Sequence, residues 1–488
     1  MTMTGKATPA GVPLSTMAVL MLAVFTVSMG FGVLLPLLPY LVERLLGING
    51  DAAQVSRSTG LLTATYTLAL FLFAPIWGRM SDLYGRRAIL LAGLVGFGAT
   101  MLVFSFIENF VAVYAERFLS GLFAAAVTPV ALAVIGDLAA TEEARARRLT
   151  FVNLAGISGF LLGPMLGVFI AQGASKILPG PRLAGSLAIP LAATAIMALL
   201  VAFAVALAVP GTKPGEPARN FEALPSATSA WLVPRLLALA FVVSSGVGAF
   251  EVGLALRGKQ ELGLTQYQIA VMYSECSLVM FVVQAIVFSP WFKPEMTRWL
   301  IAPAFAVLAA GLFLVPRASN FTLMLTVVGA VAASAGILSP ILTYWISSKA
   351  GLAQGAELGK QTAAASLGGV VGSAAGGLLF DIPPLPDAAF VLMTALTVLG
   401  FLVSLGLPNI LVPRKVGQPA CNRKAEKVSK VMALIAMVGV TSALHRIRPS
   451  PAPNQSSDRI ASRSADAAAT ASGAEPGSPR PFTPIIET

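Results

Sequence analysis

Long apolar runs, separated by short polar breaks, fill most of the chain between Thr16 and Val412. A helix needs about 20 predominantly apolar residues to cross a bilayer, and these runs reach that length repeatedly. They predict an all-α membrane protein with twelve transmembrane helices in two six-helix bundles. The expected spans are residues 16–40, 58–78, 88–107, 110–138, 150–172 and 185–209, then 232–256, 266–290, 297–316, 320–347, 361–381 and 388–412.

Polar segments divide this pattern. Residues 1–15 lack a small-residue cleavage site before the first span, so we expect them to be retained as an N-terminal segment. Residues 210–231 contain proline and glycine and are polar, which predicts a linker between the bundles at 16–209 and 232–412.

The C-terminal part of the chain has a different composition. Residues 413–488 are rich in Ala, Ser and Pro, which predicts a largely disordered tail. Residues 431–444 are apolar but short for a span, and lysines precede them. We therefore expect an amphipathic helix on the anionic inner leaflet there, with a thirteenth span as the alternative.

Composition supports the membrane assignment. Hydrophobic residues make up 56% of the chain and charged residues 11%, and the mean hydropathy is +0.81. A water-soluble globule of this size has no way to bury so much apolar surface. The net charge of +11 lies in loops and in the tail, not on one face, so no nucleic-acid partner is indicated.

Basic residues gather in alternate loops, which the positive-inside rule assigns to the cytoplasm together with both termini. The intervening loops hold fewer of them, so the rule is followed as a bias. The basic residues of the expected cytoplasmic loops are Arg79, Arg86, Arg87, Arg145, Arg147, Arg148, Lys213, Arg219, Lys293, Arg298, Lys349 and Lys360.

The sequence does not contain the residue patterns that metal binding, redox chemistry or nucleotide binding require. Cys276 and Cys421 are the two cysteines and His445 is the single histidine, so neither a disulfide framework nor a metal site is predicted. The best match to a phosphate loop has Gln361 where Ser or Thr must follow Lys360. We expect no cofactor and no enzymatic activity.

Glycines recur at every fourth position in two equivalent spans, the fifth and the eleventh. Small residues at this spacing let helices approach closely, and repetition across halves is typical of a transporter with its site at the repeat interface. The two triplets are Gly159, Gly163 and Gly167, and Gly368, Gly372 and Gly376.

The break after the second span reads GRMSDLYGRR. Taken alone, it is a charged hairpin in which Asp82 accepts hydrogen bonds at a helix start and Arg86 pairs with a carboxylate of a neighbouring span; a plain basic loop is the alternative. It resembles the signature loop of the major facilitator superfamily, GxxxDxxGRR, which implies that superfamily's fold. The resemblance also implies a latch that holds the outward-open state, with Asp137 as the acid at the end of the fourth span. The matching positions are Gly78, Asp82, Gly85, Arg86 and Arg87.

Two further segments resemble motifs of that superfamily. Glu116-Arg117 in the fourth span is similar to its second motif, in which an embedded Arg takes part in proton coupling; an Arg snorkelling to the interface is the alternative. The fifth span, with Pro164 among its glycines, resembles the antiporter motif of drug/proton antiporters; ordinary helix packing is the alternative. The first span resembles that of twelve-span exporters but lacks their acid.

Intramembrane acids are the candidate proton carriers, because no histidine lies in a span. They are Glu116, Asp137, Glu251, Glu275 and Asp381. Glu251 and Glu275 are the first choices. For Glu251 the alternative is a structural pair with Arg257 near a helix end.

Side chains that stack or hydrogen-bond are expected to line a central substrate cavity. These candidates are Phe160, Tyr273, Gln284, Tyr344 and Trp345.

The leading functional prediction is proton-coupled efflux of small hydrophobic or cationic compounds by alternating access. Its partners are the substrate, protons and membrane lipid, in a monomer that resides in a bacterial inner membrane, as the family resemblance implies. The alternatives are proton-coupled metabolite uptake or symport, and a non-transporting sensor or scaffold that uses the tail.

Overall fold

A computed structural model gives the structure of the chain. It describes residues 13–47, 51–107, 109–138, 142–177, 188–211, 231–287, 294–349, 354–380 and 387–411, together with residues 382 and 385. The expected tail at 413–488, its helix at 431–444, most of the linker at 210–231, and Asp381 lie outside the described residues.

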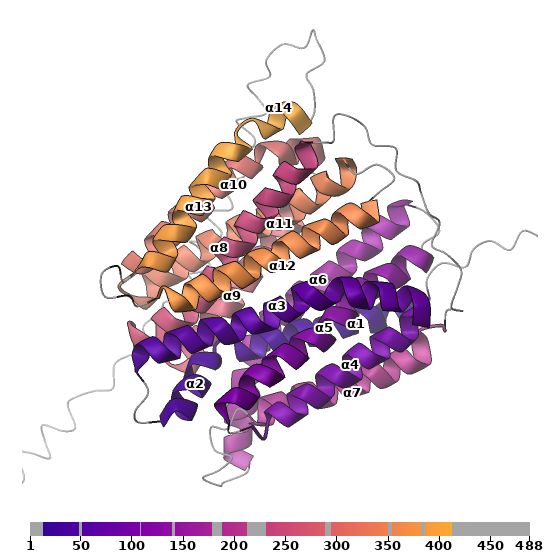
Figure 1. Ribbon diagram of the computed structural model, residues 1–488, viewed down its shortest axis with the longest axis horizontal. Coiled ribbons are helices and arrows are strands. Elements are labelled where there is room, and N and C mark those ends of the chain that lie inside the picture. Colours follow the sequence, from indigo (N-terminus) through magenta and orange to yellow (C-terminus); the bar gives the residue numbers. More distant parts are fainter. Residues whose placement is uncertain are drawn as a thin grey trace, which may run out of the picture. The chain divides into compact units, whose positions relative to one another are not determined.

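The described residues are helical almost throughout (Figure 1). The first set of helices is α1 (Leu14–Leu34), α2 (Leu38–Leu46), α3 (Ala52–Tyr84), α4 (Arg86–Phe104), α5 (Phe110–Leu138), α6 (Glu142–Ile177) and α7 (Ala188–Ala208). The second set is α8 (Leu232–Gln260), α9 (Gln266–Val287), η3 (Pro294–Trp299), α10 (Ile301–Leu314), η4 (Val315–Arg317), α11 (Phe321–Lys349), α12 (Gln354–Leu378), α13 (Ala388–Ser404) and α14 (Leu407–Leu411).

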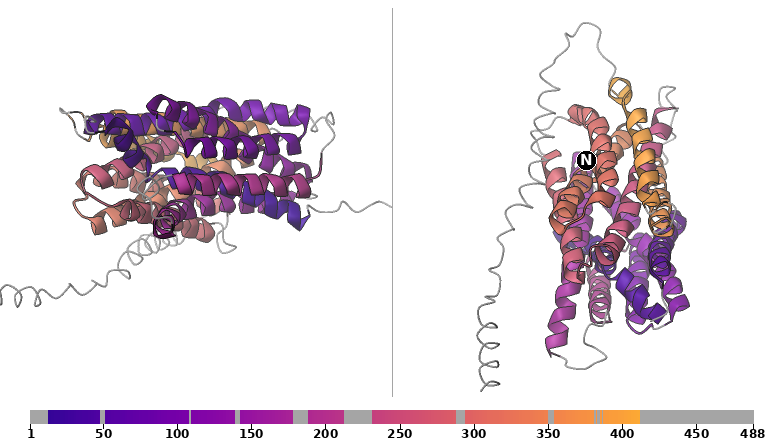
Figure 2. Two further views of the ribbon diagram at one scale, coloured as in Figure 1. Left: turned by 90° about the horizontal axis from the view of Figure 1, so that it is seen from below. Right: turned by 90° about the vertical axis from the view of Figure 1, so that its left-hand side faces the viewer.

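Among the described residues, ten helices are long and apolar enough to cross a membrane, and α13 is a shorter apolar helix. The glycine-rich helix α12 packs against both α8 and α3. The prediction of an all-α, multi-span membrane fold is confirmed. The helices lie lengthwise beside one another (Figure 2).

Two expected boundaries were wrong. The first span was expected to run to residue 40, but α1 ends at Leu34 and the separate helix α2 begins at Leu38. Pro36 lies at this break, and proline has no backbone N–H with which to continue a helix. Pro39 lies in the first turn of α2, where a backbone N–H needs no partner within the helix. The signature segment is also no loop, because α3 continues to Tyr84 and only Gly85, at φ +93°, separates it from α4.

Glycines set the close packing of two equivalent helix pairs, α6 on α1 and α12 on α8. A Cβ added at Gly163 would lie 2.6 Å from the Met29 backbone oxygen, and one at Gly372 would lie 2.0 Å from that of Ser245. Neither helix pair has room for a larger residue at these positions. The glycine repeat therefore serves the same packing in both halves.

The two sets of helices meet along α3 and α12, with α6 against α9 as a second contact (Figure 1). Gly60 on α3 and Gly377 on α12 face each other so closely that a Cβ on either would lie 2.5 Å from the other's Cα. Ser274 on α9 donates a hydrogen bond to the Leu161 backbone oxygen on α6 at 3.2 Å. These contacts position the interior side chains of the two halves toward each other.

Candidate functional site

The charged cluster at the α3–α4 junction joins three elements. Arg86 Nε lies 3.0 Å from Asp137 Oδ2 at the end of α5, and Arg86 Nη1 lies 2.5 Å from Asp82 Oδ1. Arg86 also donates to the Ser81 hydroxyl at 2.6 Å. The expected contact of Arg86 with an acid of a neighbouring span is present in this geometry, whereas its role as a conformational latch stays a prediction.

Other residues of the signature segment differ from expectation or serve packing. Asp82 lies in the last turn of α3, so the expectation that it stands at a helix start was wrong. Gly78 is an internal residue of α3 with open space around it. Arg87 donates to the Ala206 backbone oxygen near the end of α7, a favourable place for a cation because carbonyls there are unpaired.

Glu116 and Arg117 form a buried ion pair on α5. Arg117 Nε lies 2.7 Å from Glu116 Oε2 and Arg117 Nη2 lies 3.0 Å from Glu116 Oε1, and both side chains are 3% exposed. The guanidinium also lies over the Phe104 ring at 4.7 Å and near the Tyr66 ring at 5.7 Å. The interfacial, snorkelling alternative for Arg117 was therefore wrong. The two charges cancel, and the two parallel hydrogen bonds between guanidinium and carboxylate stabilise the ion pair.

An aromatic cluster lies beside this pair, with one ring from each of α1, α3 and α6. Phe31 stacks on Tyr66 at 5.0 Å between centroids, and Phe160 lies 5.9 Å from Phe31. Phe31, Tyr66 and Arg117 also line a small cavity with Leu62. Of these rings, only Phe160 was expected from the sequence. In the sequence, the position of Phe31 between Gly30 and Gly32 is the feature that could have indicated a ring at a close helix contact.

The residues of the predicted antiporter motif lie on the side of α6 that packs on α1. Cβ atoms at Gly159 and Gly163 would meet backbone atoms of α1, and Pro164 Cδ lies close to the Gly32 position. A Cβ added at Gly167 would lie 3.0 Å from Val33 Cγ1, a less severe contact. The motif therefore joins α6 to the helix that carries Phe31.

Glu251 lies on α8 and is partly buried. Among the described residues it has no ion-pair partner. Arg257, its expected alternative partner, instead lies 2.5 Å from Glu261 and 3.9 Å from Asp387. The alternative of a structural Glu251–Arg257 pair was therefore wrong.

Tyr273 and Cys276 lie on α9, which packs beside α8. The Tyr273 hydroxyl donates to the Glu251 backbone oxygen, which joins α9 to α8. Glu275 precedes Cys276 on α9, the helix that this hydrogen bond joins to α8. Proton coupling by Glu251 and Glu275 stays a prediction.

The remaining cavity candidates do not form one group. Tyr273 is 1% exposed and Trp345 is 3% exposed, and the Trp345 indole donates to the Thr297 hydroxyl at 3.1 Å. Tyr344 is half-exposed on α11 and packs edge-on against Trp345 at 5.3 Å, and Gln284 is partly buried on α9. Only Phe160 joins the aromatic cluster. No group of three or more metal-ligating side chains occurs among the described residues.

Curated relatives cover most of the chain. It is 27% identical over 380 residues to "Multidrug resistance protein 1" of Bacillus subtilis (strain 168), with 75% of this chain and 90% of that protein covered. It is 24% identical over 370 residues to "Quinolone resistance protein NorA" of Staphylococcus aureus (strain COL), with 75% and 89% covered.

Two solved structures share the fold. The human organic anion transporter MFSD10 (TETRAN) matches with a TM-score of 0.62 at 20% identity, over 80% of this chain and 100% of that chain. A D-xylose-proton symporter matches with a TM-score of 0.65 at 16% identity, over 83% and 99%. At these identities the likeness concerns the fold alone.

The family model described as the Major Facilitator Superfamily matches residues 20–357. This match covers more than half of the chain and includes the signature segment, the buried pair on α5 and the glycine motif of α6. Members of this family are transporters and not enzymes. The chain belongs to the Major Facilitator Superfamily and is a multi-pass membrane transporter.

Proposed function

We propose that this transporter exports small hydrophobic or cationic compounds in exchange for protons. The observation that carries the proposal is Glu251, an acid inside the second set of helices without an ion-pair partner among the described residues. Ionisable residues inside the membrane are costly and mark proton or substrate pathways. A carboxylate that can take up and release a proton meets the need of a proton-driven cycle.

The first set of helices supports the cargo that we propose. Glu116 neutralises Arg117, so the site holds no free cation there to attract an anionic substrate. The stacked Phe31 and Tyr66, with Phe160 beside them, provide flat apolar surfaces. Aromatic rings bind apolar groups and also cations through their faces. The multidrug and quinolone resistance named for the two bacterial relatives agrees with such cargo.

We further propose an orientation with both termini in the cytoplasm of a bacterium whose inner membrane holds the protein as a monomer. The α3–α4 junction, with Arg79, Arg86 and Arg87, would then face the cytoplasm by the positive-inside rule. The C-terminal end of α8, near Lys259, would then face the outside of the cell. Residues 210–231 and 413–488 are the proposed linker and tail on the cytoplasmic side.

The test is proton flux in proteoliposomes that carry a pH gradient. A panel of lipophilic cations and neutral aromatic compounds is added to the wild type, Glu251→Gln and Glu275→Gln. Asp51→Asn is the matched control, because Asp51 is an exposed acid that makes no side-chain cap bond. We expect at least one compound to dissipate the gradient through the wild type and the control, but not through Glu251→Gln.

The alternatives give other outcomes in the same assay. If a compound moves together with protons down the gradient, the protein is a symporter. If no compound moves protons through the wild type, proton-coupled efflux is wrong, and metabolite transport or a sensor role takes its place.

A further inference from the structure

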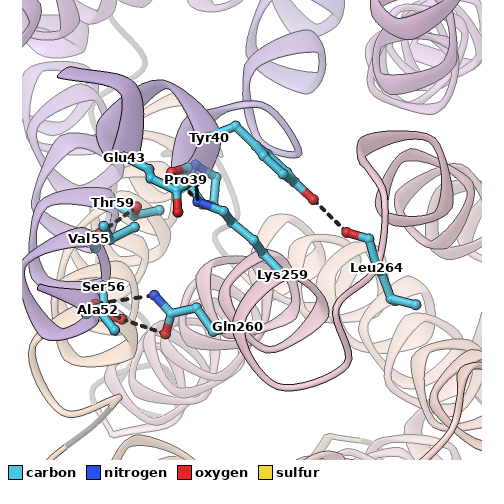
Figure 3. Close-up of polar contacts among 10 residues, drawn as sticks. All are labelled: Pro39, Tyr40, Glu43, Ala52, Val55, Ser56, Thr59, Lys259, Gln260 and Leu264. Carbon is cyan, nitrogen blue, oxygen red and sulfur yellow. Dashed lines mark hydrogen bonds and ion pairs between the residues drawn. The ribbon is translucent and has the colours of Figure 1, made fainter. Parts of the chain in front are cut away.

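We propose that Lys259 and Gln260, at the end of α8, clasp the first set of helices and keep the outer end of the transport pathway closed. Their partners are Tyr40 and Glu43 on α2 and Ser56 on α3, and we call these five residues the outer clasp (Figure 3). The inference rests on alternating access in this transporter family. It requires neither a particular substrate nor proton coupling.

Lys259 makes three contacts at once with α2. Its Nζ lies 2.5 Å from Glu43 Oε2, donates to the Pro39 backbone oxygen at 3.1 Å, and lies 4.8 Å from the centre of the Tyr40 ring. The Lys259 side chain is 11% exposed, whereas that of Glu43 is 60% exposed. An ordinary exposed ion pair contributes little, but this ammonium is mostly buried and satisfies a carboxylate, a carbonyl and a ring.

Two more cross-links flank Lys259. Gln260 Nε2 donates to the Ala52 backbone oxygen at 3.2 Å, and the Ser56 hydroxyl donates to Gln260 Oε1 at 3.2 Å. On the other side, the Tyr40 hydroxyl donates to the Leu264 backbone oxygen at 2.6 Å. Figure 3 shows these contacts side by side between the two sets of helices.

Local sequence explains why these groups meet. The break at Pro36 lets α2 form its own short helix, which carries Tyr40 and Glu43 and packs against α3. After Gln260 the chain turns through Gly263, whose φ of +58° favours glycine. This turn presents the Leu264 carbonyl to Tyr40.

The clasp differs from the charged cluster at the α3–α4 junction in what it connects. Arg86, Asp82 and Asp137 all belong to the first set of helices, so their pairing can persist while the two sets move apart. Lys259 and Glu43 belong to different sets. Outward opening must therefore separate them in every cycle, and the strength of the clasp sets how often the outer end opens.

Thr59 offers a direct readout, because it lies on α3 one turn after Ser56 in the sequence and is 1% exposed (Figure 3). Thr59→Cys is introduced into a chain with Cys276→Ser and Cys421→Ser. Its reaction with a membrane-impermeant maleimide is timed in intact cells and in inside-out vesicles. The pair of preparations identifies the side of access whichever way the chain is inserted.

We compare this reporter alone with Lys259→Met, Glu43→Gln and the charge swap Glu43→Lys with Lys259→Glu. The matched control is Lys360→Met, which removes a lysine–glutamate pair of 2.7 Å that lies within α12 alone. Lys259→Met should raise the labelling rate from the outer side about fivefold, and Glu43→Gln about twofold. Both increases correspond to free energies within the range that ion pairs at protein surfaces contribute. The swap should return the rate toward that of the reporter alone, and the control should leave it unchanged.

Two results would overturn the clasp. One is an outer labelling rate unaffected by both Lys259→Met and Glu43→Gln, of which the latter alters an exposed side chain and leaves folding intact. The other is an equal acceleration by Lys360→Met, which would indicate general loosening. Labelling needs no substrate and no pH gradient, so failure of proton-coupled efflux would leave this test standing.

Discussion

The two sets of helices bury their acids in different ways. In the first set, Glu116 and Arg117 neutralise each other at 2.7 Å, and both are 3% exposed. In the second set, Glu251 is partly buried and has no ion-pair partner among the described residues. A buried pair is costly to break, because removal of one charge leaves the other buried and uncompensated. In the mechanism that we propose, the first set is a fixed electrostatic frame and the proton exchanges in the second.

The largest effect on stability should come from breaking the pair in the first set. Glu116→Gln leaves Arg117 buried and unpaired, which should lower the free energy of unfolding by about 3–5 kcal/mol. Removing both charges, in Glu116→Gln with Arg117→Gln, should restore much of that loss. Denaturant unfolding in detergent measures both variants. Equal losses in the single and double variants would show that the pair is not a unit.

The next effect concerns the packing that both halves share. Gly163→Ala and Gly372→Ala should each lower the free energy of unfolding by about 1–3 kcal/mol, because the new methyl group meets a neighbouring backbone oxygen. Gly78→Ala is the control, since Gly78 is helical with open space around it, and there alanine should stabilise by about 0.5–1 kcal/mol. A loss at only one of the two packed positions would mean that the halves are not equivalent in packing.

A smaller change is expected from the same chemical substitution in the second half. Glu251→Gln removes no ion pair among the described residues, so the free energy of unfolding should change by less than about 1 kcal/mol. Thermal unfolding compared side by side with Glu116→Gln checks this contrast. A loss as large as that of Glu116→Gln would place Glu251 in a structural pair and remove the difference between the halves.

The smallest effect should appear at the α3–α4 junction. Asp137 is 42% exposed, so Asp137→Asn should cost only about 0.2–1 kcal/mol of stability despite the 3.0 Å contact with Arg86. High salt should reduce the difference between this variant and the wild type. If the variant unfolds at the same denaturant concentration as the wild type at every salt concentration, the contact contributes nothing measurable.

Hydrophobic runs were sufficient to predict the membrane fold, because each span must bury its apolar side chains in lipid or protein. Glycine spacing indicated the equivalent packing of α6 and α12 for the same local reason. The partner of Arg117 was less predictable, since residues adjacent on a helix do not normally face each other. The side chains of Glu116 and Arg117 are long enough to turn toward each other, and this contact became evident only in the structure.

Contacts between the halves could not be predicted from one sequence. Glu43 and Lys259 are 216 positions apart, and in the sequence both are ordinary charges near span ends. Phe31 and Tyr66 likewise belong to different helices, and their stacking depends on how α1 and α3 meet. Local patterns determine helices and turns, whereas such pairs depend on the packing of distant segments.

Substrate counterflow measured beside gradient-driven transport, in proteoliposomes with Glu251→Gln, tests the central claim most directly. Counterflow exchanges labelled for unlabelled substrate without a pH gradient, so it reports binding and alternating access alone. The account predicts that Glu251→Gln retains counterflow and loses transport driven by the pH gradient. If gradient-driven transport through Glu251→Gln equals that of the wild type, Glu251 does not carry the proton and the proposed division between the halves is wrong.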